Sequence, residues 1–292
     1  MLVYKGERVV ESGAARLAVR EYGGQRAKKG PHVVFVHGFP DDQTLWEGVL
    51  AQLKGIHAIT YDVRGAGSSS TPASLREYRN DRLVDDLVAV VEATVPAGEQ
   101  FHLVGHDWGS IQSWDAVVDP RLQHRIASFV TASGPSIDHV AASLRGRPQR
   151  ALVQQLAHSF YVAAFQLPWL PERAWRSEHR LTPAILKILR AQGGASTWSP
   201  RLAHNASNHV NLYRANMAPK LLRPHPPLVE VPVLVVVATQ DNLVGPVYVG
   251  TIEKYCKEVK RVEIDAPHWH PLSDPTLLAA VLTEHLQIAK RT

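Results

Sequence analysis

The sequence predicts an α/β fold with a mostly parallel, doubly wound sheet, and three observations predict it. Short continuous apolar runs, of the kind buried in parallel sheets, recur along the chain and begin with residues 32–36. Segments with apolar residues at helical spacing, such as 79–95, separate these runs. The alternation stops after residue 132 and resumes at 231, so we expect helices to be inserted between two parts of one core.

The predicted elements follow in a regular order. Two alternating stretches, residues 5–10 and 16–22, predict a hairpin at the edge of the sheet. Each later apolar run is followed by a stretch with helical spacing, as expected for parallel strands joined by helices. The predicted core strands are residues 32–36, 58–61, 101–104, 126–132, 231–238 and 262–264, and the predicted core helices are residues 44–53, 79–95, 110–118 and 275–289.

The interval between the two parts of the core predicts a helical cap. It lacks strand-like runs, contains helical segments at 150–165 and 182–191, and has prolines at both edges. The predicted organisation is a first core part at residues 1–134, a helical cap or lid at 135–227, and a second core part at 228–292.

Composition excludes several classes of protein. The 292 residues are 45% hydrophobic and 20% charged, which is typical of a globular protein. The net charge is +5, but the basic residues are scattered and no zinc-ligand or helix-turn-helix pattern occurs, so no nucleic-acid partner is expected. No stretch approaches the roughly 18 apolar residues of a membrane helix, so we expect no integral membrane segment. Cys256 is the single cysteine, which favours a reducing, cytoplasmic location. Oligomeric state stays open, a homodimer included.

Residues 104–109, Val-Gly-His-Asp-Trp-Gly, match the sharp strand-to-helix turn called a nucleophile elbow, GxSxG, with Asp107 where serine normally lies. A carboxylate is already anionic at neutral pH and suits displacement at a saturated carbon. We therefore expect Asp107 to be exposed at the end of a strand and to accept an alkyl group. Taken alone, the pattern also fits a surface turn with a solvated aspartate.

At these residues the chain resembles the α/β-hydrolase family, and within it the epoxide hydrolase and haloalkane dehalogenase branch that uses an aspartate nucleophile. The resemblance covers nearly the whole chain and implies the order nucleophile, acid, histidine, each after a core strand. It assigns Asp107 as the nucleophile and Asp241 as the acid. His268 matches the histidine of the family's GHW motif, but Pro267 replaces the glycine, which leaves His270 as a rival base.

The stretch 37–40, His-Gly-Phe-Pro, resembles the family's HGxP loop. The resemblance implies an oxyanion hole formed by the backbone amides of Phe39 and Trp108. Haloalkane dehalogenases commonly place asparagine at the position of Phe39, where its N–H helps to hold the departing halide. Phenylalanine has no such donor, so Trp108 supplies at most half of a halide site unless a cap residue provides the rest.

Two tyrosines of the predicted cap favour epoxides. Tyr161 lies in a stretch resembling the family's YxxxFQxP, and Tyr213 in one resembling its NxYR. The resemblance implies that both hydroxyls assist opening of the ring, which needs a proton donor at the leaving oxygen. The predicted function is therefore hydrolysis of a small apolar epoxide to a vicinal diol through an ester on Asp107, with no metal or organic cofactor. Cap aromatics predict either an apolar pocket or packing within the cap: Phe160, Phe165, Trp169, Trp175 and Trp198.

Alternatives from other classes remain. A haloalkane or haloacid dehalogenase would use the same nucleophile and histidine. A ligand-binding protein with little turnover would keep the pocket, although the complete set of acid, base and nucleophile argues against it. A serine esterase is disfavoured because Ser110 lies past the apex of the elbow.

Overall fold

The computed structural model describes residues 2–24, 30–145, 150, 160–176, 181–194 and 200–286. Within these residues the chain forms an eight-stranded sheet in the order β1-β2-β4-β3-β5-β6-β7-β8. β1 pairs antiparallel with β2, β2 pairs antiparallel with β4, and every later pair is parallel. The predicted edge hairpin and mostly parallel sheet are thus confirmed. The strands are β1 (Val3–Ser12), β2 (Ala15–Gly23), β3 (His32–Val36), β4 (His57–Tyr61), β5 (Phe101–His106), β6 (Ile126–Ala132), β7 (Val233–Ala238) and β8 (Val259–Ile264).

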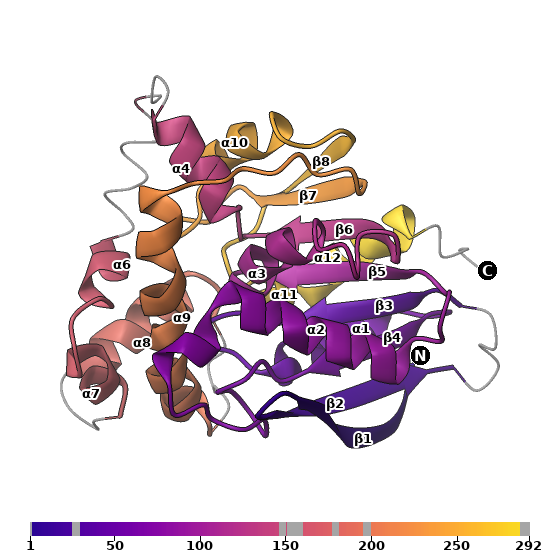
Figure 1. Ribbon diagram of the computed structural model, residues 1–292, viewed down its shortest axis with the longest axis horizontal. Coiled ribbons are helices and arrows are strands. Elements are labelled where there is room, and N and C mark those ends of the chain that lie inside the picture. The colour runs from indigo at the N-terminus through magenta and orange to yellow at the C-terminus, as the bar shows by residue number, and fades with distance from the viewer. Residues whose placement is uncertain are drawn as a thin grey trace.

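Two groups of helices cover the sheet (Figure 1). α1 packs with α11 and α12, while α2 packs with α3, which gives the double winding that the alternation predicts. The core helices are α1 (Glu47–Gln52), α2 (Asn80–Thr94), α3 (Trp108–Ala116), α10 (Val249–Glu253), α11 (His270–Ser273) and α12 (Pro275–His285), and the 3-10 helices are η1 (Gln43–Trp46), η2 (Leu75–Tyr78) and η3 (Pro246–Tyr248).

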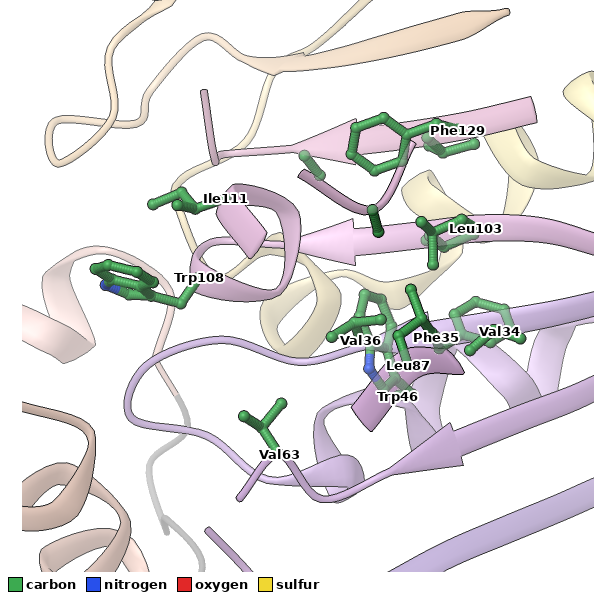
Figure 2. Close-up of a cluster of buried hydrophobic side chains, with 14 of the residues drawn as sticks. Val34, Phe35, Val36, Trp46, Val63, Leu87, Leu103, Trp108, Ile111 and Phe129 are labelled. Carbon is green, nitrogen blue, oxygen red and sulfur yellow. The ribbon is translucent and has the colours of Figure 1, made fainter. Parts of the chain in front are cut away.

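The main hydrophobic core lies between the central strands and these helices, as Figure 2 shows. Phe35 of β3 packs against Trp46 of η1, with ring centroids 5.2 Å apart, and both side chains are fully buried. Leu103 and Phe129 extend the core across β5 and β6. Continuous apolar runs form these strands because both faces of a parallel sheet are covered.

Five described helices lie between β6 and β7 along the chain, and we call them the inserted helices. Figure 1 shows them grouped at one end of the sheet, the end at which β5 leads into α3. None of the described helices is both long and apolar enough to cross a membrane. The inserted helices are α4 (Ile137–Arg145), α6 (Phe160–Ala164), α7 (Leu170–Arg176), α8 (Leu181–Ala191) and α9 (Leu202–Leu222).

Polar side chains of α9 attach it to loops of the core. Asn216 accepts a hydrogen bond from the backbone N–H of Asn80 at 2.8 Å and donates one to the carbonyl of Tyr78 at 2.8 Å. Asn208 donates to the carbonyl of Gly65 at 2.9 Å. These buried amides satisfy backbone groups at the ends of core elements, so they fix α9 against the core loops at that end of the sheet.

Candidate active site

Asp107 occupies the sharp turn between β5 and α3. Its backbone has φ 51° and ψ −124°, a left-handed conformation that costs a non-glycine residue free energy. The turn closes tightly, because a Cβ at Gly109 would lie 2.0 Å from the carbonyl oxygen of Val36 and one at Gly105 would lie 2.6 Å from the Cα of Ser110. The glycines thus allow the strand and helix to approach closely enough to present Asp107.

The side chain of Asp107 is buried, with 6% of the residue exposed, so the expected exposure is wrong. The reason is that Tyr161 and Tyr213 of the inserted helices enclose the same pocket. Burial raises the pKa of Asp107 to about 6, although the charge of His268 and hydrogen bonds from backbone N–H groups lower it. Asp107 is therefore an anion at neutral pH that has lost most of its water.

Two backbone amides hold the carboxylate of Asp107. The N–H of Phe39 donates to Oδ1 at 2.7 Å, and the N–H of Trp108 also donates to this carboxylate. His37 fixes the loop that carries Phe39, because its Nδ1–H donates to the carbonyl of Gly38 at 3.0 Å and its Nε2 accepts from the N–H of Val63 at 2.9 Å. These are the two amides that the sequence assigns to an oxyanion hole.

His268 lies on the other side of Asp107 and is bound to Asp241. Its Nδ1 is 2.8 Å from Oδ2 of Asp241, and its Nε2 is 3.8 Å from Oδ2 of Asp107. The second oxygen of Asp241 accepts from the N–H groups of Leu243 and Val244 at 2.9 Å and 2.8 Å. Burial lowers the pKa of His268, but the charge and hydrogen bond of Asp241, with the charge of Asp107, outweigh it and raise that pKa above its usual value.

His270 is fully buried and does not occupy this position. Its ring lies against His106 in an edge-on contact, with centroids 5.8 Å apart, and neither ring nitrogen has a hydrogen-bond partner among the described residues. Burial and the nearby charge of His268 lower the pKa of His270 to about 3, so it stays neutral. The structure therefore brings His268, rather than His270, to Asp107 and Asp241.

Asp41 is a further acidic residue at the site, and the sequence reasoning did not single it out. Its Oδ2 accepts a hydrogen bond from the indole N–H of Trp269 at 2.9 Å. Burial raises the pKa of Asp41 to about 8, and the charges of Asp107 and Asp42 add to this effect while His268 opposes it. The sequence feature that could have identified Asp41 is its position directly after the HGFP stretch, which places it in the same loop.

Tyr161 of α6 and Tyr213 of α9 face the pocket from the inserted helices. Their rings meet edge to face with centroids 6.1 Å apart, and Tyr213 also packs edge-on against Trp108 at 4.8 Å. Burial raises the pKa of both hydroxyls, and the negative charge of Asp107 raises it further. Both hydroxyls stay protonated at neutral pH and can donate hydrogen bonds to a bound molecule.

The pocket consists of two apolar chambers that meet at Asp107, Tyr161 and Tyr213. The chamber next to α4, here called the α4 chamber, has a volume of 370 Å³ and is lined by side chains such as Ile111, Val140 and Met217. The chamber next to α8, the α8 chamber, has a volume of 470 Å³ and is lined by side chains such as Phe165, Trp175 and Ile185.

The expectation that cap aromatics line an apolar pocket holds for some of them. Phe165 and Trp175 line the α8 chamber. Trp169 is 66% exposed and lies outside both chambers. Trp198 and the side chain of Phe160 lie outside the part of the chain that the structure describes.

Comparison with known proteins agrees with this architecture. The family described as "alpha/beta hydrolase fold" matches residues 31–275. A crystal structure of an epoxide hydrolase from Bacillus megaterium in complex with an inhibitor has a TM-score of 0.78 and 22% sequence identity, over 96% of this chain and 100% of that chain. At this identity the likeness concerns the fold.

Curated relatives are similar in sequence over different lengths. "Probable oxidoreductase EphD" of Mycobacterium tuberculosis is 32% identical over 309 residues, which cover 97% of this chain and 50% of that protein. This chain therefore spans about half the length of that relative. "Epoxide hydrolase A" of the same organism is 32% identical over 170 residues, which cover 57% of this chain and 49% of that protein.

Proposed function

This chain belongs to the α/β-hydrolase fold family, and on that premise we propose that it hydrolyses an apolar epoxide to a vicinal diol through an ester on Asp107. One observation carries the proposal. A dehydrated carboxylate shares an apolar pocket with two protonated tyrosines and with a histidine bound to a second carboxylate. The first carboxylate and the two tyrosines can open a strained ring, and the histidine with the second carboxylate can release the product from the protein.

In the first step, the carboxylate of Asp107 attacks one carbon of the epoxide and the carbon–oxygen bond breaks. The electrons pass to the ring oxygen, which takes a proton from the pair Tyr161 and Tyr213. Because burial keeps both phenols protonated, they can act as donors at neutral pH. Burial of the Asp107 anion in turn strengthens its attraction to the carbon that carries developing positive charge.

In the second step, water attacks the carboxyl carbon of the Asp107 ester and gives one proton to His268. The acyl carbon–oxygen bond then breaks, the departing diol oxygen takes the proton from His268, and the proton of the restored Asp107 carboxyl returns to the phenol that lost its own. Ester formation removes the negative charge of Asp107, which otherwise raises the pKa of His268. The pKa of His268 then falls, so more of the imidazole is neutral at neutral pH and available to accept a proton from water. Asp241 orients the ring and stabilises its charged form, while the amides of Phe39 and Trp108 bind the oxyanion that forms on Asp107.

The helices between β6 and β7 act as a cap in this proposal. Residues 135–227 form the cap, and residues 1–134 and 228–292 form the two parts of the core. The cap supplies both tyrosines and covers Asp107, so water and substrate meet in a largely apolar space. Several relatives carry epoxide hydrolase names, which supports the same choice of substrate.

A haloalkane dehalogenase is the second candidate, and Trp108 is the observation that favours it. Its indole nitrogen is buried and has no partner with hydrogen-bond geometry among the described residues, although it lies near enough to the hydroxyl of Tyr213 to oppose the rise of that pKa. Figure 2 shows the Trp108 ring pointing away from β5, toward the side of the inserted helices. Phe39 opposes this candidate, because a departing halide would lack the second donor at that position.

Labelled water tests the proposal. Under single-turnover conditions in isotopically labelled water, the label should enter the carboxylate of Asp107 before it reaches any diol, and mass spectrometry of the peptide that contains Asp107 measures it. Direct entry of the label into the diol would exclude the ester. An Asp107→Ala variant that keeps full turnover would do the same, and halide release without diol formation would favour the second candidate.

A further inference from the structure

The two chambers meet at the reacting group and extend to different sides of it. Asp107, Tyr161 and Tyr213 line both chambers, so a ring bound between the carboxylate and the phenols would contact both. In the view of Figure 1, α6 lies between α4 above it and α7 and α8 below it. Tyr161 on α6 marks the junction: the next residue, Val162, lines the α4 chamber, and Ala164 lines the α8 chamber.

Both chambers are apolar along their described walls. Apart from tyrosines, the ionisable side chains among the described lining residues are Asp107 in both chambers and His268 in the α8 chamber. Away from Asp107 and His268, a charged substituent would therefore lose its hydration without a partner of opposite charge among the described lining residues. Each chamber accepts an uncharged, apolar group.

Each chamber also has exposed residues in its wall. Gln166 and Leu221, which line the α4 chamber, are exposed. Leu167 and Ile188, which line the α8 chamber, are exposed by 48% and 53%. The pocket therefore extends as an apolar chamber on either side of Asp107, rather than as one cavity that ends at the nucleophile.

We infer that the substrate is an internal epoxide with an apolar arm on each ring carbon, one arm in the α4 chamber and the other in the α8 chamber. The inference rests on the proposed function and specifies its substrate class. A terminal epoxide would fill one chamber and leave the apolar wall of the other in contact with water. Since burial of apolar surface drives binding, an epoxide in the middle of a chain gains contacts that its terminal isomer lacks.

Two isomers with the same number of carbons test this substrate class. One is a linear alkane epoxide with the ring at the middle of the chain, and the other has the ring at the end. For the unmodified protein we expect kcat/KM for the mid-chain isomer to exceed that for the terminal isomer by roughly ten-fold or more, the discrimination that one or a few buried methylenes provide. A preference for the terminal isomer would overturn the inference.

Variants that fill one chamber locate the arms. Val140→Trp narrows the α4 chamber and Ile185→Trp narrows the α8 chamber, whereas Val9→Trp adds the same side chain at a position that is 64% exposed on β1. Each chamber variant should lower kcat/KM for the mid-chain isomer more than for the terminal isomer, and Val9→Trp should change neither. If either chamber variant reduces both isomers equally, that chamber does not hold an arm.

A binding measurement separates this inference from the proposed function. In the Asp107→Asn variant, which lacks the anionic nucleophile, tryptophan fluorescence titration with each isomer reports occupancy without turnover. Tighter binding of the mid-chain isomer by roughly ten-fold supports the two-armed substrate, and equal binding overturns it. Turnover of a short epoxide that fills neither chamber tests the proposed function alone, because it needs only Asp107, His268 and the tyrosines.

Discussion

The Nε2 atom of His268 lies 3.8 Å from Oδ2 of Asp107, which is too long for a hydrogen bond, although Nδ1 of the same ring is 2.8 Å from Asp241. The imidazole is therefore oriented by Asp241 and faces Asp107 across a gap. Charge still couples His268 and Asp107 at this distance, because the charge of Asp107 adds to the larger effect of Asp241 in raising the pKa of His268. This arrangement suits a base that acts on water next to Asp107 rather than a base that activates Asp107 itself.

Replacement of His268 by glutamine should separate the two chemical steps. His268→Gln leaves the carboxylate of Asp107 and its amide contacts in place, so ester formation continues, while hydrolysis loses its base. We expect kcat to fall by roughly a hundred-fold or more and the alkyl-protein to accumulate. Mass spectrometry of the intact protein after mixing with epoxide measures the adduct.

His270→Gln is the matched control for that experiment. His270 is equally buried and lies two residues further along the chain, but it contacts His106 rather than Asp107 or Asp241. Its variant should turn over without an accumulated adduct. Adduct accumulation in His270→Gln, with normal turnover in His268→Gln, would assign the base to His270 instead.

The rate of ester formation should depend on the ionisation of Asp107. Since burial raises the pKa of this carboxyl to about 6, the rate of the first turnover should rise as pH increases through about 6 and then level off. Rapid-quench measurement of the first turnover between about pH 5 and 8 gives the pH dependence of ester formation. This range extends roughly one to two pH units to either side of the pKa of Asp107. A rate that stays constant down to about pH 5 would mean that the carboxyl titrates near its usual value.

The strands of the core were predictable because their burial follows from sequence alone. Residues 32–36 form a continuous apolar run, and the structure has β3 at the same bounds, His32–Val36. β5 extends to His106, two residues beyond its predicted end at Val104. The prediction ended early because the apolar run stops there, and the strand continues through a glycine and a buried polar histidine. Motif positions likewise predicted that Asp107, Asp241 and His268 would each follow a core strand.

The part of the site that depends on the inserted helices was not predictable in the same way. α9 carries many asparagines and lacks an apolar stripe, so periodicity does not identify it. Its polar residues are buried because they bind backbone groups of core loops, as Asn216 binds Asn80 and Tyr78. Burial of Asp107 and the course of the two chambers follow from where α6 and α9 pack, which is a tertiary property.

Removal of either phenolic hydroxyl should slow the first step. Tyr161→Phe and Tyr213→Phe keep the aromatic contacts with their neighbours, but each removes a hydroxyl that can donate a proton to the epoxide oxygen. Each variant should reduce the rate of ester formation, and the double variant should lose roughly a hundred-fold or more, since it has no donor left from this pair. Rapid-quench kinetics with a single epoxide measures all three.

Tyr255→Phe serves as the comparison, because Tyr255 stacks on His139 and does not line either chamber. Its first-turnover rate should match that of the unmodified protein. If the double variant at the pocket also keeps the unmodified rate, the ring oxygen takes its proton from another source and the assignment of the tyrosines is wrong.

Trp108→Phe distinguishes the two candidate functions. The change keeps an aromatic ring beside Tyr213 and the backbone amide that binds Asp107, but removes the indole N–H. An epoxide hydrolase should retain kcat/KM within about five-fold, the value of one neutral hydrogen bond. A dehalogenase would lose halide release almost entirely, because that N–H is its remaining halide donor. Diol and halide formation are measured on the same preparation.

The buried carboxyl of Asp41 should make stability depend on pH. Because burial raises its pKa to about 8 in the folded protein, the folded state keeps a proton that the unfolded chain releases near pH 4. The free energy of unfolding contributed by Asp41 therefore decreases as pH rises from about 4 to about 8, and it changes no further above that range. Asp41→Asn cannot ionise, so urea denaturation should give a weaker loss of stability across this range than in the unmodified protein.

Asp41→Ala separates this electrostatic effect from the hydrogen bond. Asparagine retains an oxygen that can accept from the indole N–H of Trp269, whereas alanine removes this acceptor. Asp41→Ala should therefore be less stable than Asp41→Asn by about 1–3 kcal/mol at every pH. The two variants should share the same weakened pH dependence, because neither carries the carboxyl. If Asp41→Asn instead keeps the full slope of the unmodified protein, Asp41 titrates normally in the folded state and another buried acid causes the slope.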